Sequence, residues 1–159
     1  MSKFIDINTF EIKDNYFEVD DNIAEAISLL NKKGYKTRNC CEGHLFLEEF
    51  AVGGDEAVDD EWETNCGVEE GYVEFDSSIT ITSVPNGWTL CDRSDIEDTQ
   101  TIYFEYPVIK SLKDIKVKDS ENVKNQFAKE RTSGMNSLLK WVNELPKLNY
   151  RKESELNCF

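Results

Sequence analysis

The chain has 159 residues, of which 39% are hydrophobic and 11% aromatic, and its formal net charge at neutral pH is −14. This length fits one domain that buries roughly 70% of the surface of its unfolded chain, and the apolar content excludes a fully disordered protein. No apolar run approaches the roughly 20 residues that span a bilayer, and the N-terminus lacks the apolar core of a signal peptide. The five cysteines are odd in number and irregularly spaced, which argues against a disulfide framework. We therefore expect a cytoplasmic protein with one domain over residues 1–147 and a polar tail over residues 148–159.

The negative charge is concentrated in one segment. Residues 39–92 contain fourteen acids and no lysine or arginine, whereas acids and bases cancel in the rest of the chain. A protein that binds nucleic acid directly would show a basic patch, so we expect no direct contact with nucleic acid. The segment suits a basic partner protein, or a surface that imitates nucleic acid. The alternative is a solvated acidic face that only keeps the protein soluble.

The N-terminal part predicts short strands and then an amphipathic helix. Residues 1–19 alternate loosely and predict one or two strands. Asp20, Asp21 and Asn22 are good N-cap residues, so we expect the helix to begin here. Its apolar residues recur at three- and four-residue steps, and Gly34 is placed to take the left-handed position after its end.

The middle of the chain predicts strands on both sides of an acidic connection. Residues 35–41 and 45–52 predict two strands that are separated by a Gly-His turn. Residues 53–71 predict a connection, because they are too many and too acidic for a simple turn. Residues 72–82 alternate with a period of two and predict a strand with one face on the core. A short strand is expected at residues 88–91, after a Pro-Asn-Gly turn.

The C-terminal part predicts one more strand and a long helix. Residues 102–108 alternate and predict a strand that ends near Pro107 and runs antiparallel to the 72–82 strand. Apolar residues then recur at helical steps from Ser120 to Leu145, and the Ser133-Gly134 pair predicts a kink or a split. Together these elements predict an α+β fold, with a mostly antiparallel sheet of four to six strands and two helices packed on one face.

Cysteine and histidine side chains make a zinc site one hypothesis. A structural zinc ion takes four such ligands, and the candidate ligands are Cys40, Cys41, His44, Cys66 and Cys91. Adjacent residues of a strand point to opposite faces, so Cys40 and Cys41 are not expected to reach the same ion. The alternative is that one of the two packs in the core as a small apolar side chain. No other cofactor is expected.

The turn that contains Cys41, Gly43 and His44 is a candidate site for a small ligand. Gly43 lets the backbone approach a ligand closely, and His44 can donate a hydrogen bond to it. A Cys41–His44 nucleophile is a second alternative, but the acidic surroundings would raise the pKa of the thiol. The simplest alternative is that His44 only completes the turn. No residue is assigned a catalytic role, because no complete catalytic motif is present.

One stretch, residues 22–44, reads NIAEAISLLNKKGYKTRNCCEGH. It resembles a group of small, uncharacterised proteins from phages and prophages of Gram-positive bacteria. They open with a helix, then Gly-Tyr-x-Thr, and then a Cys-x-Gly-His turn. They close with an aromatic strand and a helix that bears tryptophan, and residues 101–108 and 138–142 fit that ending.

The same turn is distantly similar to the Ser-Cys-Ser-Gly-Arg motif of the wybutosine-synthesis methyltransferases, which act on transfer RNA. Thr37, Cys41 and Gly43 match that motif. Cys40 stands in place of the serine and His44 in place of the arginine.

These observations favour a non-catalytic interaction protein. The concentration of acids and the absence of a complete catalytic set, in a protein that resembles phage proteins, suggest an inhibitor of a host nucleic-acid-handling or CRISPR-type defence protein, acting in the host cytoplasm through an acidic surface that imitates nucleic acid. No membrane contact is expected. The alternatives are a nucleotide- or small-ligand-binding protein or enzyme that uses residues 40–44, and a zinc-stabilised fold. The residues expected to bind the partner are Glu48, Glu49, Asp55, Glu56, Asp59, Asp60, Glu61, Trp62, Glu63, Glu69 and Glu70.

Overall fold

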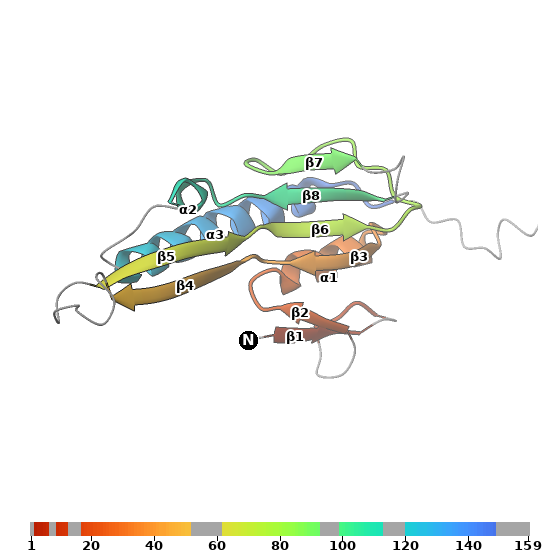
Figure 1. Cartoon of the computed structure of the whole chain (residues 1–159). Coiled ribbons are helices and arrows are strands. Elements are labelled where there is room, and N and C mark those ends of the chain that lie inside the picture. Colours follow the sequence, from red (N-terminus) through yellow and green to blue (C-terminus); the bar gives the residue numbers. More distant parts are fainter. Residues whose placement is uncertain are drawn as a thin grey trace, which may run out of the picture.

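The fold, seen in a computed structural model, is an antiparallel sheet with helices along one face (Figure 1). The structure describes residues 2–6, 9–12, 17–51, 62–92, 99–112 and 120–148. The strands are β1 (Ser2–Ile5), β2 (Phe17–Asp20), β3 (Thr37–Cys41), β4 (His44–Ala51), β5 (Trp62–Glu69), β6 (Gly71–Phe75), β7 (Thr89–Asp92) and β8 (Gln100–Phe104). The helices are α1 (Ala24–Lys32), α2 (Pro107–Ser111) and α3 (Ser120–Glu144). This confirms the predicted α+β class.

Four strands form the main sheet in the order β3-β6-β8-β7, and every neighbouring pair is antiparallel. β4 and β5 form a two-stranded ribbon that continues the β3–β6 pair in the same register. Cys41 pairs with Tyr72, and His44 pairs with Glu69 three residues further along both strands. β1 and β2 form a separate hairpin. β3–β6 and β4–β5 are therefore two halves of one long ladder.

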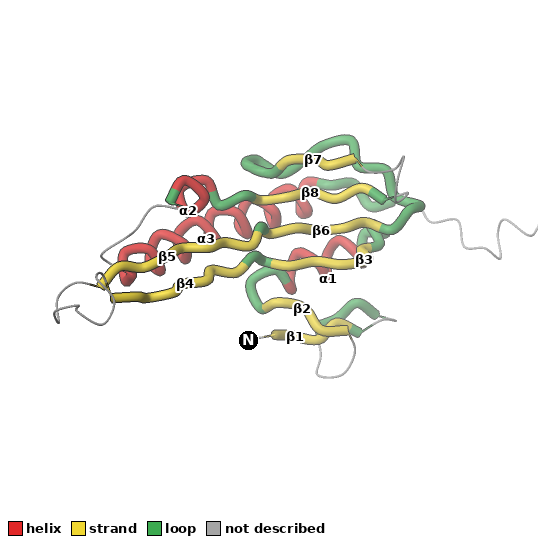
Figure 2. The backbone as a smooth tube through the Cα atoms, in the orientation of Figure 1, coloured by secondary structure: helices red, strands yellow, loops and turns green. Residues whose placement is uncertain are grey.

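Strand alternation decides which face of the main sheet packs on the helices. Val73 and Ile102 are fully buried, whereas Tyr72 and Tyr103 on the opposite face are half-buried. Figure 2 shows α1 and α3 lying along one side of the sheet. The core therefore lies between that side and the two long helices, and the Tyr72 side is the open face. Among the described residues, no helix is both long and apolar enough to cross a membrane.

The predicted end of the first helix is confirmed. Gly34 has a φ of 94°, and its N–H donates to the carbonyl of Asn31 at 3.0 Å. The N–H of Tyr35 donates to the carbonyl of Leu30 at 2.9 Å. This pair of bonds is the Schellman motif, which satisfies carbonyls that the last turn leaves without partners.

The predicted start of that helix is wrong. α1 begins at Ala24, and its N-cap residue, Ile23, makes no side-chain capping bond. Asp20 and Asn22, which were expected to cap the helix, bond instead to Glu42, as described below.

Lys33 joins the C-terminal ends of the two long helices. Its ammonium group donates to three carbonyls at the end of α3, those of Val142, Asn143 and Leu145, at 2.7–2.9 Å. A cation at this position satisfies carbonyls that lack helical partners and opposes the negative end of the helix dipole. The end of α1 thereby caps the end of α3.

Three strand predictions require correction. Residues 62–69, expected within a connection, form β5, because they pair with β4 along its length. β6 ends at Phe75, so the predicted 72–82 strand is too long. Ile81 is nevertheless buried, and its N–H donates to the side chain of Gln100 instead of to a strand. The strand that was expected to end near Pro107 ends at Phe104, and the chain then passes through Tyr106, at a φ of 52°, into α2.

The last helix is not split at Ser133-Gly134. α3 is one helix, and Gly134 is where the ring of Phe104 packs against it. A Cβ on Gly134 would lie 2.6–2.8 Å from three atoms of that ring. The indole N–H of Trp88 also donates to the Gly134 carbonyl at 3.0 Å. This glycine is therefore a packing position and not a break.

Candidate functional site

The candidate site lies at the junction of the two halves of the ladder, where Gly43 has a φ of 90°. A Cβ on Gly43 would lie 2.5 Å from a ring carbon of Tyr106 and 2.7 Å from the carbonyl oxygen of Glu69. The Tyr106 side chain is fully buried, and its hydroxyl donates to the carbonyl of Glu42. The turn therefore needs glycine both for its backbone angle and for its contact with Tyr106.

Glu42 ties this turn to the N-terminal hairpin. Its backbone N–H donates to Oδ2 of Asp20 at 3.0 Å, and its own Oε2 accepts from the N–H of Asn22 at 2.9 Å. The Glu42 residue is buried, and a guanidinium nitrogen of Arg131 lies 4.0 Å from Oε1. Because buried carboxylates are stable only when they are hydrogen-bonded, the reciprocal bonds with residues 20–22 explain why Glu42 can be buried here.

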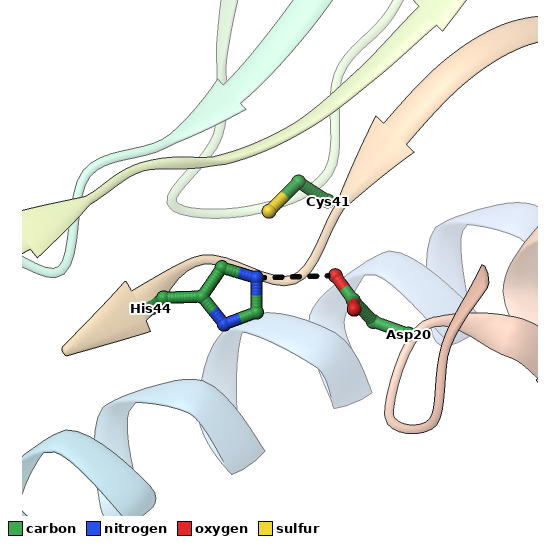
Figure 3. Close-up of side chains that lie close together, drawn as sticks. All are labelled: Asp20, Cys41 and His44. Carbon is green, nitrogen blue, oxygen red and sulfur yellow. Dashed lines mark ion pairs between the residues drawn. The ribbon is translucent and has the colours of Figure 1, made fainter. Parts of the chain in front are cut away.

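The same turn brings Asp20, Cys41 and His44 together (Figure 3). The three side chains each offer one ligand atom, and these atoms all lie within 4.8 Å of one another. Nε2 of His44 lies 3.5 Å from Oδ2 of Asp20. Asp20 comes from the end of β2, Cys41 from the end of β3 and His44 from the start of β4. The side chains of His44 and Asp20 are 45% and 25% exposed, so solvent reaches the cluster.

The surroundings of Cys41 do not favour a reactive thiolate. Burial raises the pKa of the Cys41 thiol to about 11; the N–H of Gly43, which donates to Sγ at 3.3 Å, acts against that rise, and the Asp20 carboxylate adds to it. Burial also raises the pKa of the neighbouring Cys40 to about 12. In the absence of a cation, both cysteines are protonated at neutral pH and are poor nucleophiles.

The other predicted zinc ligands do not join this cluster. Among the described residues, the group of three or more possible ligands within reach of one ion is Asp20, Cys41 and His44. Cys66 is buried opposite Leu47 on the ribbon, and Cys91 lies on β7, the edge of the main sheet farthest from β3. At roughly 4.8 Å per strand, three strand spacings place Cys91 far outside the reach of an ion bound at Cys41.

Asp20 is the member of the cluster that the sequence did not assign to it. The residue carries a strong helix-capping signal, and it lies twenty-one positions before Cys41. The bonds between residues 20–22 and Glu42 bring the Asp20 carboxylate to the turn. No pattern of neighbouring residues in the sequence predicts such long-range bonds.

The predicted partner-binding residues are only partly described. Glu48, Glu69 and Glu70 are exposed. The backbones of Glu49, Trp62 and Glu63 lie in the ribbon, where Glu49 pairs with Thr64 and Glu63 with Phe50. The remaining ones, Asp55, Glu56, Asp59, Asp60 and Glu61, lie outside the described residues.

The outer side of the ribbon also exposes an aromatic ring. Alternation buries Leu45 and Leu47 in part, whereas His44, Phe46 and Glu48 are exposed. The Phe46 residue is 53% exposed, and the residue paired with it is Gly67, which has no side chain to cover the ring. We use the term ribbon face for Phe46, Glu48 and Glu69.

Comparisons of this chain with protein-family models, curated proteins and solved structures found no match. The functional argument therefore depends on the ribbon face and on the cluster at the turn.

Proposed function

We propose that this protein is an acidic interaction protein that docks its ribbon face on a basic surface of another protein. The observation that carries the proposal is the combination of exposed acids with an exposed aromatic ring. Glu48 and Glu69 make no ion pair with any described residue, and residues 39–92 contain no lysine or arginine that could neutralise them. A basic partner would supply the missing charges.

Phe46 supports docking rather than simple solubility. Aromatic residues are enriched at the centres of protein interfaces, where they fill pockets, and acids around them steer the partner and set its orientation. An exposed phenylalanine does not increase solubility, so its presence on this face is not explained by solubility alone. The ring and the two carboxylates together suit a pocket that is rimmed by lysine or arginine.

The partner we propose is a protein whose basic surface otherwise binds nucleic acid. Residues 52–61, which join β4 to β5 in the sequence, add five more acids. A surface of this charge would compete with phosphate groups for lysine and arginine. The resemblance to phage proteins favours a host defence protein as the target.

Charge reversal on the ribbon face tests the proposal. The double variant Glu48→Lys with Glu69→Lys should lose most of the binding to nucleic-acid-binding proteins captured from nuclease-treated host lysate. The matched control is Glu18→Lys with Glu144→Lys, which makes the same charge change at exposed positions on β2 and α3. The control should bind as the unsubstituted protein does. Binding by the unsubstituted protein should weaken steeply between low and physiological salt.

A competition assay then tests the mode of action. A captured protein is purified, loaded with a fluorescent DNA duplex, and titrated with each variant while anisotropy is followed. The unchanged protein and the control should displace the duplex, and the ribbon-face variant should not. If both double variants bind equally well, or if the captured proteins keep their DNA, the proposal is wrong.

A further inference from the structure

We infer that Asp20, Cys41 and His44 bind a zinc ion and leave a fourth coordination position open to water. The three side chains supply a carboxylate oxygen, a thiol sulfur and an imidazole nitrogen, which are the ligand atoms that zinc takes in proteins. This ligand set differs from the one that the cysteine pattern of the sequence suggests, since it uses a carboxylate and one cysteine.

The geometry of the cluster fits one ion. Zinc lies about 2.0–2.3 Å from its ligands, so neighbouring ligand atoms in a tetrahedral site are roughly 3.3–3.8 Å apart. Nε2 of His44 and Oδ2 of Asp20 are already 3.5 Å apart, and all three ligand atoms lie within 4.8 Å of one another. Binding one ion requires the three ligand atoms, which now lie within 4.8 Å of one another, to approach to roughly 3.3–3.8 Å.

The backbone around the cluster holds these ligands in place. The N–H of Glu42 donates to Asp20, and the N–H of Gly43 donates to the sulfur of Cys41. The backbone of His44 is held by its place in the ladder opposite Glu69. Bonds of this kind from outside the coordination shell orient metal ligands and raise affinity. The turn therefore presents three ligands that are positioned before the ion arrives.

The charges around the cluster also favour a cation. Asp20 and Glu69 are both close enough to Cys41 to act on its charge, and Cys41 and His44 lie within the segment that has no lysine or arginine. On binding, the thiol of Cys41 loses its proton to the buffer and the sulfur forms the bond to zinc. The bound ion would add two positive charges close to the carboxylates of Asp20 and Glu69.

The mixed ligand set selects among metals. Thiolate and imidazole suit zinc, whereas magnesium and calcium prefer oxygen ligands alone. The open position and the exposure of His44 resemble accessible zinc sites rather than closed structural ones. The ion would also join β2 to the junction of β3 and β4, so that zinc should raise the melting temperature.

The test is metal titration of the full chain after removal of bound metal with a chelator. We expect one zinc ion per chain, a melting temperature that rises with zinc concentration, and no effect of calcium or magnesium. Cobalt should give a thiolate-to-cobalt charge-transfer absorption, which reports a bond to cysteine in the unchanged protein without any substitution. No saturable zinc binding, or cobalt binding without that absorption, would overturn the inference.

Substitutions then assign the ligands. Cys41→Ala, His44→Ala and Asp20→Asn should each lower zinc affinity more than about 100-fold, beyond the effect expected for residues outside the coordination shell. Cys40→Ala, one residue away on the same strand, should keep the affinity of the unchanged protein. Circular dichroism confirms that each variant is folded. Equal affinity in Cys40→Ala and Cys41→Ala would show that the ion binds elsewhere.

Discussion

The two halves of the long ladder have one register and two different environments. The β3–β6 half lies beside β8 and under the helices, and Val73 in it is fully buried. The β4–β5 half has no further strand beside it among the described residues, and Phe46 on it is largely exposed. Both halves turn side chains toward the core, Val73 from β6 and Cys66 from β5, so the β4–β5 half differs in its exposed outer face and in having no further strand beside it among the described residues.

The junction between these halves tolerates fewer residue types than either half, because its contacts are close and specific. Gly43 is packed against Tyr106, and Glu42 is bonded to residues of the N-terminal hairpin. The metal-ligand cluster lies at this same point. The ribbon is held relative to the core both by this junction and by the packing of Leu45 and Leu47 against the core.

The largest effect is expected for Gly43→Ala. The new Cβ would meet Tyr106 and the Glu69 carbonyl at less than 3 Å, and the backbone would remain in the left-handed region. Strain and overpacking together should lower the free energy of unfolding by about 3 kcal/mol or more. Urea unfolding measures this loss.

Gly87→Ala is the matched control for that prediction. Gly87 has a φ of 82°, but the nearest atom to its added Cβ is 3.8 Å away. The loss should be about 1–2 kcal/mol, from backbone strain alone. Equal losses in the two variants would mean that contact with Tyr106 does not hold the junction.

A pair of valines compares the two halves directly. Val73→Ala removes two methyl groups from a fully buried site in β6 and should lower the free energy of unfolding by about 2–3 kcal/mol. Val68→Ala makes the same change at a half-buried site in β5 and should cost about 1 kcal/mol. Amide hydrogen exchange should also be slower in β6 than in β5. If the two substitutions cost the same, burial does not distinguish the halves.

Glu42→Ala should lower the free energy of unfolding by about 2 kcal/mol. It leaves the N–H of Asn22 without its side-chain acceptor in a partly buried place. Glu42→Gln keeps an acceptor oxygen and should cost less than about 1 kcal/mol, because the Arg131 contact that it weakens is already 4.0 Å long. Thermal unfolding of both variants measures the difference. A loss above about 1 kcal/mol for Glu42→Gln would mean that the negative charge of Glu42 stabilises the fold.

The hydroxyl of Tyr106 should make the stability of the junction depend on alkaline pH. Burial raises the pKa of Tyr106 above its ordinary value of 10.0 in the folded protein. Above pH 10 the unfolded chain therefore loses this proton first, so the contribution of Tyr106 is complete below pH 10 and falls as the pH rises further. Tyr106→Phe should cost about 1 kcal/mol at neutral pH through the lost hydrogen bond. The difference between the two proteins should narrow above pH 10, and a constant difference would contradict the assignment.

The smallest effect on stability is expected for Phe46→Ser. The side chain is mostly in water already, so the free energy of unfolding should change by less than about 0.5 kcal/mol. Binding to a captured partner should nevertheless weaken, because the ring is proposed to enter a pocket. A large loss of stability would show that the ring packs on the protein itself.

The features that the sequence predicted correctly are those set by neighbouring residues. The end of α1 follows from Gly34, whose backbone freedom closes a local motif. The amphipathic stripe of α3 follows from helical spacing, and the buried β6–β8 strands follow from alternation. Four antiparallel strands and the α+β class could be read from these signals. The acidic character of residues 39–92 is also a property of the sequence alone.

Tertiary structure decided the features that depend on distant residues. β5 is polar and contains a glycine, and it is a strand because β4 lies beside it. Gly134 interrupts nothing, because the Phe104 ring needs the space that a side chain would fill. Asp20 has the local chemistry of a helix cap, yet Glu42 offers its carboxylate a better-placed donor, and this choice brings Asp20 to Cys41 and His44. A helix-capping pattern reports only the hydrogen bonds available from the neighbouring backbone. It fails when the folded protein contains a buried polar group elsewhere that needs the same side chain as its hydrogen-bond partner.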